Sequence, residues 1–280
     1  MQDHGDGSGT HRAAEPIDTS VPHPARRYNH WLGGKDNFQV DRDAADAIAA
    51  AFPHLPGAAR ENRRFLRRAV RMVTAEAGVR QFLDIGTGLP TVDNTHEVAQ
   101  AIAPTARIVY VDNDPLVLSH ARALLTSTSE GATAYIDADL RTPGRILDDP
   151  AVRATLDLTQ PIALMLVAIL HFIPDSAEPY AIVDKLIDAL APGSYVVLSH
   201  ATFDPLDEDT VGRLNAVNAG SVPPFCPRSK EQVARFFDRL QLVAPGIVSV
   251  AEWRARDEPQ PRPAPAEVAW YGAVARKPAR

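Results

Sequence analysis

Short apolar segments alternate with helix-like segments over most of the chain, and this alternation constrains the fold more than any other feature. Five strand-like runs occur between positions 81 and 199, and each is followed by a segment with helical spacing or helix-capping residues. The fourth run is continuously apolar, as expected for a central parallel strand buried on both faces. The five runs cover residues 81–85, 107–111, 132–136, 162–167 and 195–199.

Two more strand-like runs, 247–250 and 268–275, close the chain. Because crossovers between parallel strands are right-handed, helices should cover both faces of the sheet. We therefore predict an α/β fold with a doubly wound, mostly parallel, seven-stranded sheet. Residues 21–75 are expected to form a helical cap on a core of residues 76–280. The polar residues 1–20 are expected to be a disordered tail.

Composition excludes several classes of protein. The length of 280 residues and the 45% hydrophobic content suit one large α/β domain. The net charge of −6 argues against broad binding to nucleic-acid phosphates. No apolar run approaches the roughly 20 residues of a membrane helix, and the N-terminus has no apolar signal core, so we expect no membrane partner and a cytoplasmic location. Cys226 is the single cysteine, so no intramolecular disulfide can form.

The first strand-like run ends in Asp84, which is followed by the loop Gly86-Thr87-Gly88. In an open α/β sheet, ligands bind beyond the carboxyl ends of the strands. Glycines at such a position allow a tight turn and let a ligand approach the backbone closely. The Gly-x-Gly pattern alone is also typical of a plain strand-to-helix turn.

Two further carboxylates stand at neighbouring strand ends. Asp112 closes the second run and Asp139 follows the third. Asp112 could accept hydrogen bonds from both hydroxyls of a ribose, and Asp139 could accept one from the exocyclic amine of an adenine. Each of them alone is typical of a turn or a helix cap. Three acids at consecutive strand ends, however, indicate a nucleoside-binding site.

The glycine loop separates the possible nucleoside ligands. A dinucleotide site carries Gly-x-Gly-x-x-Gly, but here Gly88 is followed by Leu-Pro-Thr without a third glycine. A Gly-Lys-Ser or Gly-Lys-Thr phosphate loop is also absent from the sequence. An acid two positions before Gly86 suits a ligand with an ammonium group and no phosphate. S-adenosylmethionine, with its amino-acid head, ribose and adenine, has that pattern.

Several segments resemble known methyltransferases. FLDIGTGLPT, VYVDNDP and YIDADLR are similar to the first three motifs of class I S-adenosylmethionine-dependent methyltransferases. ARRYNHWLGGKDNF, ENRRFLRRAV, LHFIPD and RSKEQVARFF resemble an actinobacterial family of S-adenosyl methyltransferases that was long classed as a domain of unknown function. The resemblance extends from about Asp18 to the C-terminus.

This resemblance implies a seven-stranded sheet with an antiparallel last strand, and a set of contacts to the cofactor. Asp84 and the loop of Gly86, Thr87 and Gly88 would surround the methionine part, and Asp112 with Asn113 would hold the ribose. Asp139 and Leu140 would border the adenine. The segment from Tyr28 through Gly34 to Asn37 would fold over the site. The chain departs from the family pattern at Asn29-His30-Trp31 and at Pro90.

Methyl transfer needs an aligned nucleophile and, for a hydroxyl or a protonated amine, a nearby base. His171, just after the fourth strand, is the candidate base, although it could equally pack structurally or line the pocket. His200, at the end of the fifth strand, is a weaker candidate. No paired metal-binding motif occurs among the scattered histidines. An Asn-Pro-Pro-Tyr tetrapeptide is also absent after the fourth strand, which disfavours a nucleobase acceptor.

One predicted helix, residues 62–75, carries five arginines on its polar face, with Arg60 just before it, and this face is expected to be solvated or, alternatively, to meet an acidic partner. For the whole chain three functions remain open. The first is a methyltransferase with a small-molecule acceptor. The second is a regulator that binds S-adenosylmethionine without catalysis, and the third is an NAD-dependent oxidoreductase. Methylation of a macromolecule is a further alternative, and the sequence does not predict an oligomeric state.

Overall fold

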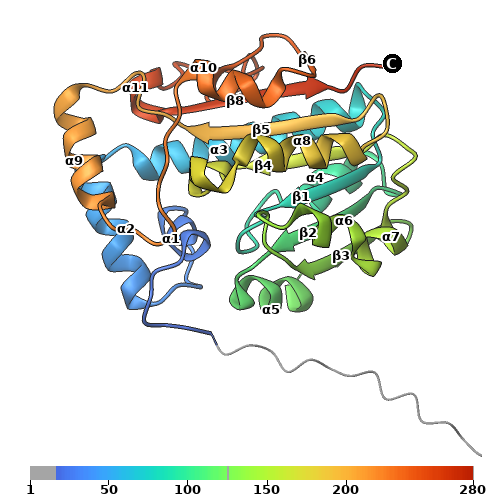
Figure 1. Ribbon diagram of the computed structural model, residues 1–280, viewed down its shortest axis with the longest axis horizontal. Helices are drawn as coiled ribbons and strands as arrows, with labels where there is room; N and C mark the ends of the chain where they lie inside the picture. The colour runs from blue at the N-terminus through green and yellow to red at the C-terminus, as the bar shows by residue number, and fades with distance from the viewer. Residues whose placement is uncertain (1–16, 125, 280) are drawn as a thin grey trace, which may run out of the picture.

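The computed structural model describes residues 17–124 and 126–279, and its centre is a single mixed β-sheet (Figure 1). The strand order is β3-β2-β1-β4-β5-β8-β6, and β7 also pairs with β8. The first five strands pair in parallel, and β8 runs antiparallel to its neighbours. The strands are β1 (Gln81–Ile85), β2 (Arg107–Asp112), β3 (Ala132–Asp137), β4 (Ala163–Val167), β5 (Tyr195–Ala201), β6 (Gln241–Leu242), β7 (Val248–Ser249) and β8 (Trp270–Arg276).

The doubly wound α/β fold and the antiparallel last strand are confirmed, but the strand number differs from the prediction. The sheet has eight strands rather than seven. The strand before β8 is replaced by two strands of two residues each, β6 and β7, which pair with opposite ends of β8. The segment between them contains Pro245 and Gly246, and a proline cannot donate to a strand ladder. The sequence pattern revealed only β7, because β6 is exposed and too short for alternation.

Helices cover both faces of the sheet. Helices α3 and α4 pack on one face, and α6, α7 and α8 pack on the other. Alternate residues of β1 supply the two cores: Phe82 joins the first, and Leu83 and Ile85 join the second. The helices are α1 (Pro24–Trp31), α2 (Gln39–Ala51), α3 (Leu55–Ala75), α4 (Thr95–Ile102), α5 (Pro115–Leu124), α6 (Pro143–Asp148), α7 (Pro150–Thr155), α8 (Pro179–Ala189), α9 (Glu208–Asn218), α10 (Lys230–Ala234) and α11 (Pro265–Val268).

The N-terminal helices meet the carboxyl-terminal end of the sheet. Figure 1 shows α1, α2 and α9 beyond the end to which the arrow of β5 points. Helix α2 packs against both α1 and α9. Of the predicted cap, α1 and α2 cover this end, whereas α3 packs on a face of the sheet. Most of the predicted tail, residues 1–16, lies outside the described residues.

Helix α3 begins at Leu55, seven residues before the predicted start at Asn62. Pro56 stands in its first turn, where a missing backbone N–H costs nothing. Its arginines are not simply a solvated face. Arg68 donates to the carbonyl oxygens of Trp253 (2.8 Å) and Val250 (2.6 Å) and, with Arg67, pairs with Glu258. Arg67 and Arg68 therefore hold the segment of residues 250–258 against α3.

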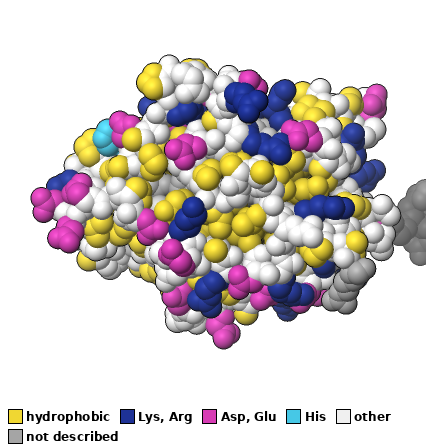
Figure 2. Space-filling model, turned by 90° about the horizontal axis from the view of Figure 1, so that it is seen from above, with side chains coloured by type: hydrophobic (Ala, Val, Ile, Leu, Met, Phe, Trp, Pro, Cys, Tyr) yellow, Lys and Arg dark blue, Asp and Glu magenta, His cyan; other side chains and the backbone are white. Residues whose placement is uncertain are grey.

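Charges of both signs are intermixed on the face of the molecule in Figure 2, without a large area of one charge. No described helix is long and apolar enough to span a membrane.

Candidate functional site

A cavity of about 520 Å³ lies between the carboxyl ends of β1, β2, β4 and β5 and the cap helices. Its volume falls within the range of small-molecule sites, roughly 300–1,000 Å³. Most of the predicted site residues share this cavity. Its lining includes Tyr28, Asp84, Gly86, Thr87, Gly88, Asp112, Asn113, Asp139, Leu140 and His171.

Asp84 is the penultimate residue of the buried strand β1, and its side chain is held by a neighbouring helix. Thr95, at the start of α4, donates its hydroxyl to Asp84 Oδ2 at 2.6 Å. Burial raises the pKa of Asp84 to about 6, although the bond from Thr95 and the positive charge of Arg63 act in the opposite direction. A cationic ligand beside such a buried carboxylate stabilises its ionised form.

Gly86 turns the chain sharply after β1. Its φ of +75° lies in the left-handed region, and a Cβ atom there would come within 2.7 Å of the side chain of Ile169. Any other residue would therefore be strained and would push against the segment after β4. The turn exposes the backbone of the loop to the cavity.

Asp112 ends β2 and fixes the glycine loop. The backbone N–H of Gly88 donates to Asp112 Oδ2 at 2.8 Å, and the N–H of Asp114 donates to Oδ1 at 3.0 Å. Burial raises the pKa of Asp112 despite these bonds. A carboxylate oxygen can accept more than one hydrogen bond, so Asp112 retains the capacity to bind hydroxyls.

Asp139 lines the cavity but is already engaged. Arg141 donates from Nε at 3.0 Å and from its backbone N–H at 2.8 Å to the Asp139 carboxylate. Asn113 Nδ2 lies 3.4 Å from Asp139 Oδ2. Leu140, which follows, is 4% exposed and packs in the second core while it borders the cavity. Asp139 and Leu140 thus form one wall, with Arg141 holding the acid in place.

Two predicted cap residues, Gly34 and Asn37, do not belong to the cavity lining among the described residues. Asn37 Nδ2 instead donates to Asn29 Oδ1 (2.8 Å) and to the Gly34 carbonyl (3.0 Å). A Cβ atom at Gly34 would collide with the side chain of Asn29. The GGKDN motif therefore builds the turn between α1 and α2, and α1 itself covers the site, with Tyr28 facing inward.

A buried ion pair attaches α1 to the core. Arg26 binds Asp114 through two hydrogen bonds, Nε to Oδ2 at 2.9 Å and Nη2 to Oδ1 at 2.8 Å. His23 approaches the same carboxylate at 3.1 Å. Burial alone would raise the pKa of Asp114, but the bonds from His23 and Arg26 outweigh it and hold the pKa well below its usual value.

His171 and His200 have different surroundings. His171 lines the cavity, and burial, together with the nearby positive charges of Arg228 and Arg27, keeps its pKa well below the usual value. Its Nδ1 lies 3.4 Å from the Ala201 backbone nitrogen, which is too long for a strong bond. His200 is outside the lining. Its Nδ1 contacts the Ala201 carbonyl oxygen (2.8 Å), and Arg228 lies 3.0 Å from its Nε2.

Sequence analysis missed several lining residues that come from distant parts of the chain. Asn62 donates to Tyr28 Oη at 3.0 Å, and its Oδ1 is buried without a partner among the described residues. Arg63 donates to the carbonyl oxygens of residues 92 and 93, yet its Nε is likewise unpaired. Both are polar and stand among other polar residues, so they look like surface positions in the sequence. Trp270 stacks with Tyr28 at a centroid distance of 6.2 Å.

Comparison with known proteins relates the whole chain to one family. Residues 10–278 match the model of a family described as S-adenosyl methyltransferase. The chain belongs to the S-adenosyl methyltransferase family. None of the curated proteins is significantly similar to it in sequence.

Two solved structures of similar proteins have the same fold. A family protein from Streptomyces avermitilis is 45% identical, with a TM-score of 0.89, and the match covers 94% of this chain and 100% of that one. A methyltransferase candidate from Thermobifida fusca is 42% identical, with a TM-score of 0.85 and coverage of 94% and 97%. The actinobacterial resemblance is thereby confirmed.

Family membership makes S-adenosylmethionine the cofactor, and the cavity fits it. Asp84 and the unpaired Oδ1 of Asn62 are acceptors for an ammonium group. Asp112 can accept from ribose hydroxyls, and the Asp139 to Leu140 wall offers one acid and one apolar surface to an adenine. The family assignment also decides against the NAD-dependent alternative.

Proposed function

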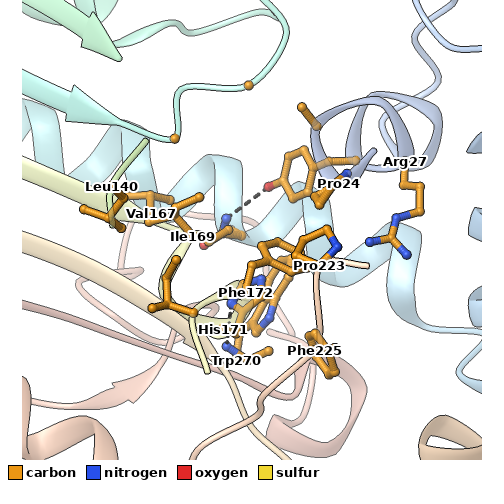
Figure 3. A pocket seen from close by; sticks show the side chains of 18 of the residues that line it. Pro24, Arg27, Leu140, Val167, Ile169, His171, Phe172, Pro223, Phe225 and Trp270 are labelled. Atoms are coloured by element: carbon orange, nitrogen blue, oxygen red, sulfur yellow. Dashed lines mark hydrogen bonds between the residues drawn. The ribbon is translucent and has the colours of Figure 1, made fainter. Parts of the chain in front are cut away.

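We propose that this family member transfers a methyl group to a small molecule bound beside His171. The observation that carries the proposal is the continuity of the cavity. It extends from the strand-end acids to an apolar half formed by His171, Phe225 and Trp270. One cavity therefore has a polar half for the cofactor and an apolar half for the acceptor. Figure 3 shows the aromatic side chains around His171 in the apolar half.

The residues around the cavity suit an in-line displacement. Bound S-adenosylmethionine supplies a methyl group that is already activated, so the protein has to align the nucleophile and exclude water. Aromatic rings restrict the apolar half: His171 stacks with Trp270 at 6.1 Å and meets Phe225 edge-on at 5.5 Å. Such a site orients a flat or compact acceptor.

His171 is the proposed general base. Its lowered pKa keeps the ring neutral at physiological pH, which is the form that accepts a proton. A base of low pKa is weak, so it assists only as the acceptor becomes acidic during attack. Nε2 can accept a proton only in the tautomer that carries its hydrogen on Nδ1, so the long contact from the Ala201 N–H to Nδ1 has to open for His171 to act as the base.

The test is a comparison of turnover and cofactor binding. Wild-type protein and His171→Ala are offered to a broad metabolite extract with methyl-labelled S-adenosylmethionine. We expect labelled product from the wild type and roughly 10²-fold less from the variant, within the range of general-base effects. Affinity for S-adenosylhomocysteine should change by no more than about twofold. His54→Ala, on the exposed side of the cap, serves as control.

Three results would contradict the proposal in different ways. Equal turnover by His171→Ala would make His171 a packing residue. No labelled product from any extract, with tight cofactor binding intact, would favour the regulator that binds without catalysis. Product found only on protein or nucleic acid would contradict the small-molecule acceptor.

A further inference from the structure

Arg27, on α1, is a buried cation whose side chain has no hydrogen bond or ion pair within residues 17–124 and 126–279. It is 6% exposed and lines the cavity. Its Nε is buried with no hydrogen-bond partner, and no ion pair of its guanidinium group occurs within the described residues. Burial lowers its pKa. Unpaired buried charges are rare because they lose hydration without compensation, so this one points to a ligand.

Asp41, the acid that acts on Arg27 electrostatically, does not account for it. The two side chains form no hydrogen bond or ion pair among the described residues, and Asp41 binds backbone N–H groups instead. Its Oδ1 accepts from the N–H of His23 at 2.8 Å, and its Oδ2 accepts from the N–H of Phe38 at 2.9 Å. The neighbouring Arg26, by contrast, donates two hydrogen bonds to the Asp114 carboxylate. The two adjacent arginines therefore differ. Arg26 attaches α1 to the core through Asp114, and Arg27 is available to bind a ligand in the cavity.

Arg27 faces the apolar half of the cavity. In Figure 3 its guanidinium group extends from α1 toward the side of Pro223 and Phe225. Its charge influences His171, whereas Arg63 is the arginine that influences Asp84 on the cofactor side. Arg27 thus lies with the residues proposed to surround the acceptor.

The shape and charge of this half define the ligand. Tyr28, Trp270 and His171 form a stack, with interplanar angles of 26° and 21°. A single guanidinium group can form two parallel hydrogen bonds with one carboxylate. A doubly charged phosphate would need a second cation, but Arg141 is paired with Asp139, and Arg63 binds backbone carbonyls.

We propose that Arg27 binds the carboxylate of the methyl acceptor, and that the acceptor is a planar, apolar acid. This inference rests on the proposed function and narrows its substrate class. The acid would fill the aromatic half of the cavity and pair with the buried cation. The methyl-accepting atom would then be held near His171 at a fixed distance from the carboxylate.

The test compares acids with their neutral amides. Probes are 4-hydroxybenzoate, 6-hydroxy-2-naphthoate and the corresponding primary amides, titrated calorimetrically into protein saturated with S-adenosylhomocysteine. We expect at least one acid to bind about tenfold or more tightly than its amide. Arg27→Gln should remove this preference, and Arg27→Lys should keep part of it, since lysine retains the charge but not the planar fork. Arg60→Gln, an exposed arginine of α3, is the matched control.

Cofactor binding separates the outcomes. Arg27→Gln should bind S-adenosylhomocysteine within about twofold of the wild type, which also shows that the variant is folded. A comparable loss of cofactor affinity in a folded variant would place Arg27 in the cofactor site and overturn the inference. Equal affinity for acid and amide, or no acid binding up to about 10 mM, would overturn it too. Failure of the wild type to bind the cofactor would instead contradict the proposed function.

Discussion

At the residue scale, the properties of the site come from charges placed where water is scarce. Asp84 is the clearest case, because burial raises its pKa to about 6 while Thr95 holds its orientation. Asp112 also has a raised pKa, but its oxygens organise the glycine loop. A cationic ligand next to Asp84 favours the ionised carboxylate and is favoured by it in turn.

Binding of the cofactor should therefore depend on pH. As pH falls through about 6, Asp84 becomes protonated in the free protein and loses its attraction for the ammonium group. We expect the Kd for S-adenosylhomocysteine to be nearly constant from pH 7 to 8 and about tenfold higher at pH 5 than at pH 7. Calorimetric titrations across this range measure the dependence.

Asp84→Asn provides the control for this dependence. The amide oxygen can still accept from Thr95, but the side chain no longer titrates. The variant should bind weakly at every pH, with a much flatter profile. A wild-type Kd that stays constant down to about pH 5, in protein that remains folded, would contradict the ammonium-binding role of Asp84.

At the scale of secondary structure, the closure of the site depends on how α1 is attached. The sequence of α1, PARRYNHW, does not predict that it covers the site, because most of its positions are polar. The helix is nevertheless fixed, because Arg26 and Asp114 form a pair whose side chains are 4% and 0% exposed. The strand ends thus supply the acidic side chains of the site, and α1 covers the cavity.

Breaking this attachment should loosen α1 before it loosens the sheet. In Arg26→Ala, the buried Asp114 keeps only His23 and backbone N–H groups as partners. We expect the free energy of unfolding near pH 7 to fall by about 3 kcal/mol. The contribution of the pair is present above about pH 4 and declines as pH falls further, because the folded-state pKa of Asp114 is depressed.

Hydrogen exchange and chemical denaturation measure the two effects. Amides of residues 24–31 should lose protection in Arg26→Ala by more than those of β1 and β4. Arg60→Ala, which removes an exposed arginine, should change neither the exchange nor the stability by a measurable amount. Unaltered exchange of α1 in Arg26→Ala would contradict the attachment.

The elements differ in how far the sequence could predict them. Buried strands such as Ala163–Val167 were predictable because both faces are apolar. Helix α9 begins at Glu208, because Asp207 caps it by accepting a hydrogen bond from the backbone N–H of Thr210. Strand β6 has only two residues, both exposed, so no pattern could indicate it.

At the scale of the whole molecule, one cavity joins the carboxyl ends of the sheet to the cap. The strand-end acids Asp84, Asp112 and Asp139 were predictable, because each stands at or just after the end of an apolar run, and all three line the cavity. Contacts across the cavity were not, since they depend on how distant helices pack. Arg27 and Asn62 stand among other polar residues in the sequence and reveal their inward orientation only in the folded chain.

A crystal structure with bound S-adenosylhomocysteine would show directly whether this cavity is the cofactor site. We expect the ligand in this cavity, with its amino group within hydrogen-bond distance of Asp84, its ribose hydroxyls on Asp112, and the apolar half beside His171 left open. A ligand bound elsewhere, or one in the cavity that touches neither Asp84 nor Asp112, would contradict it.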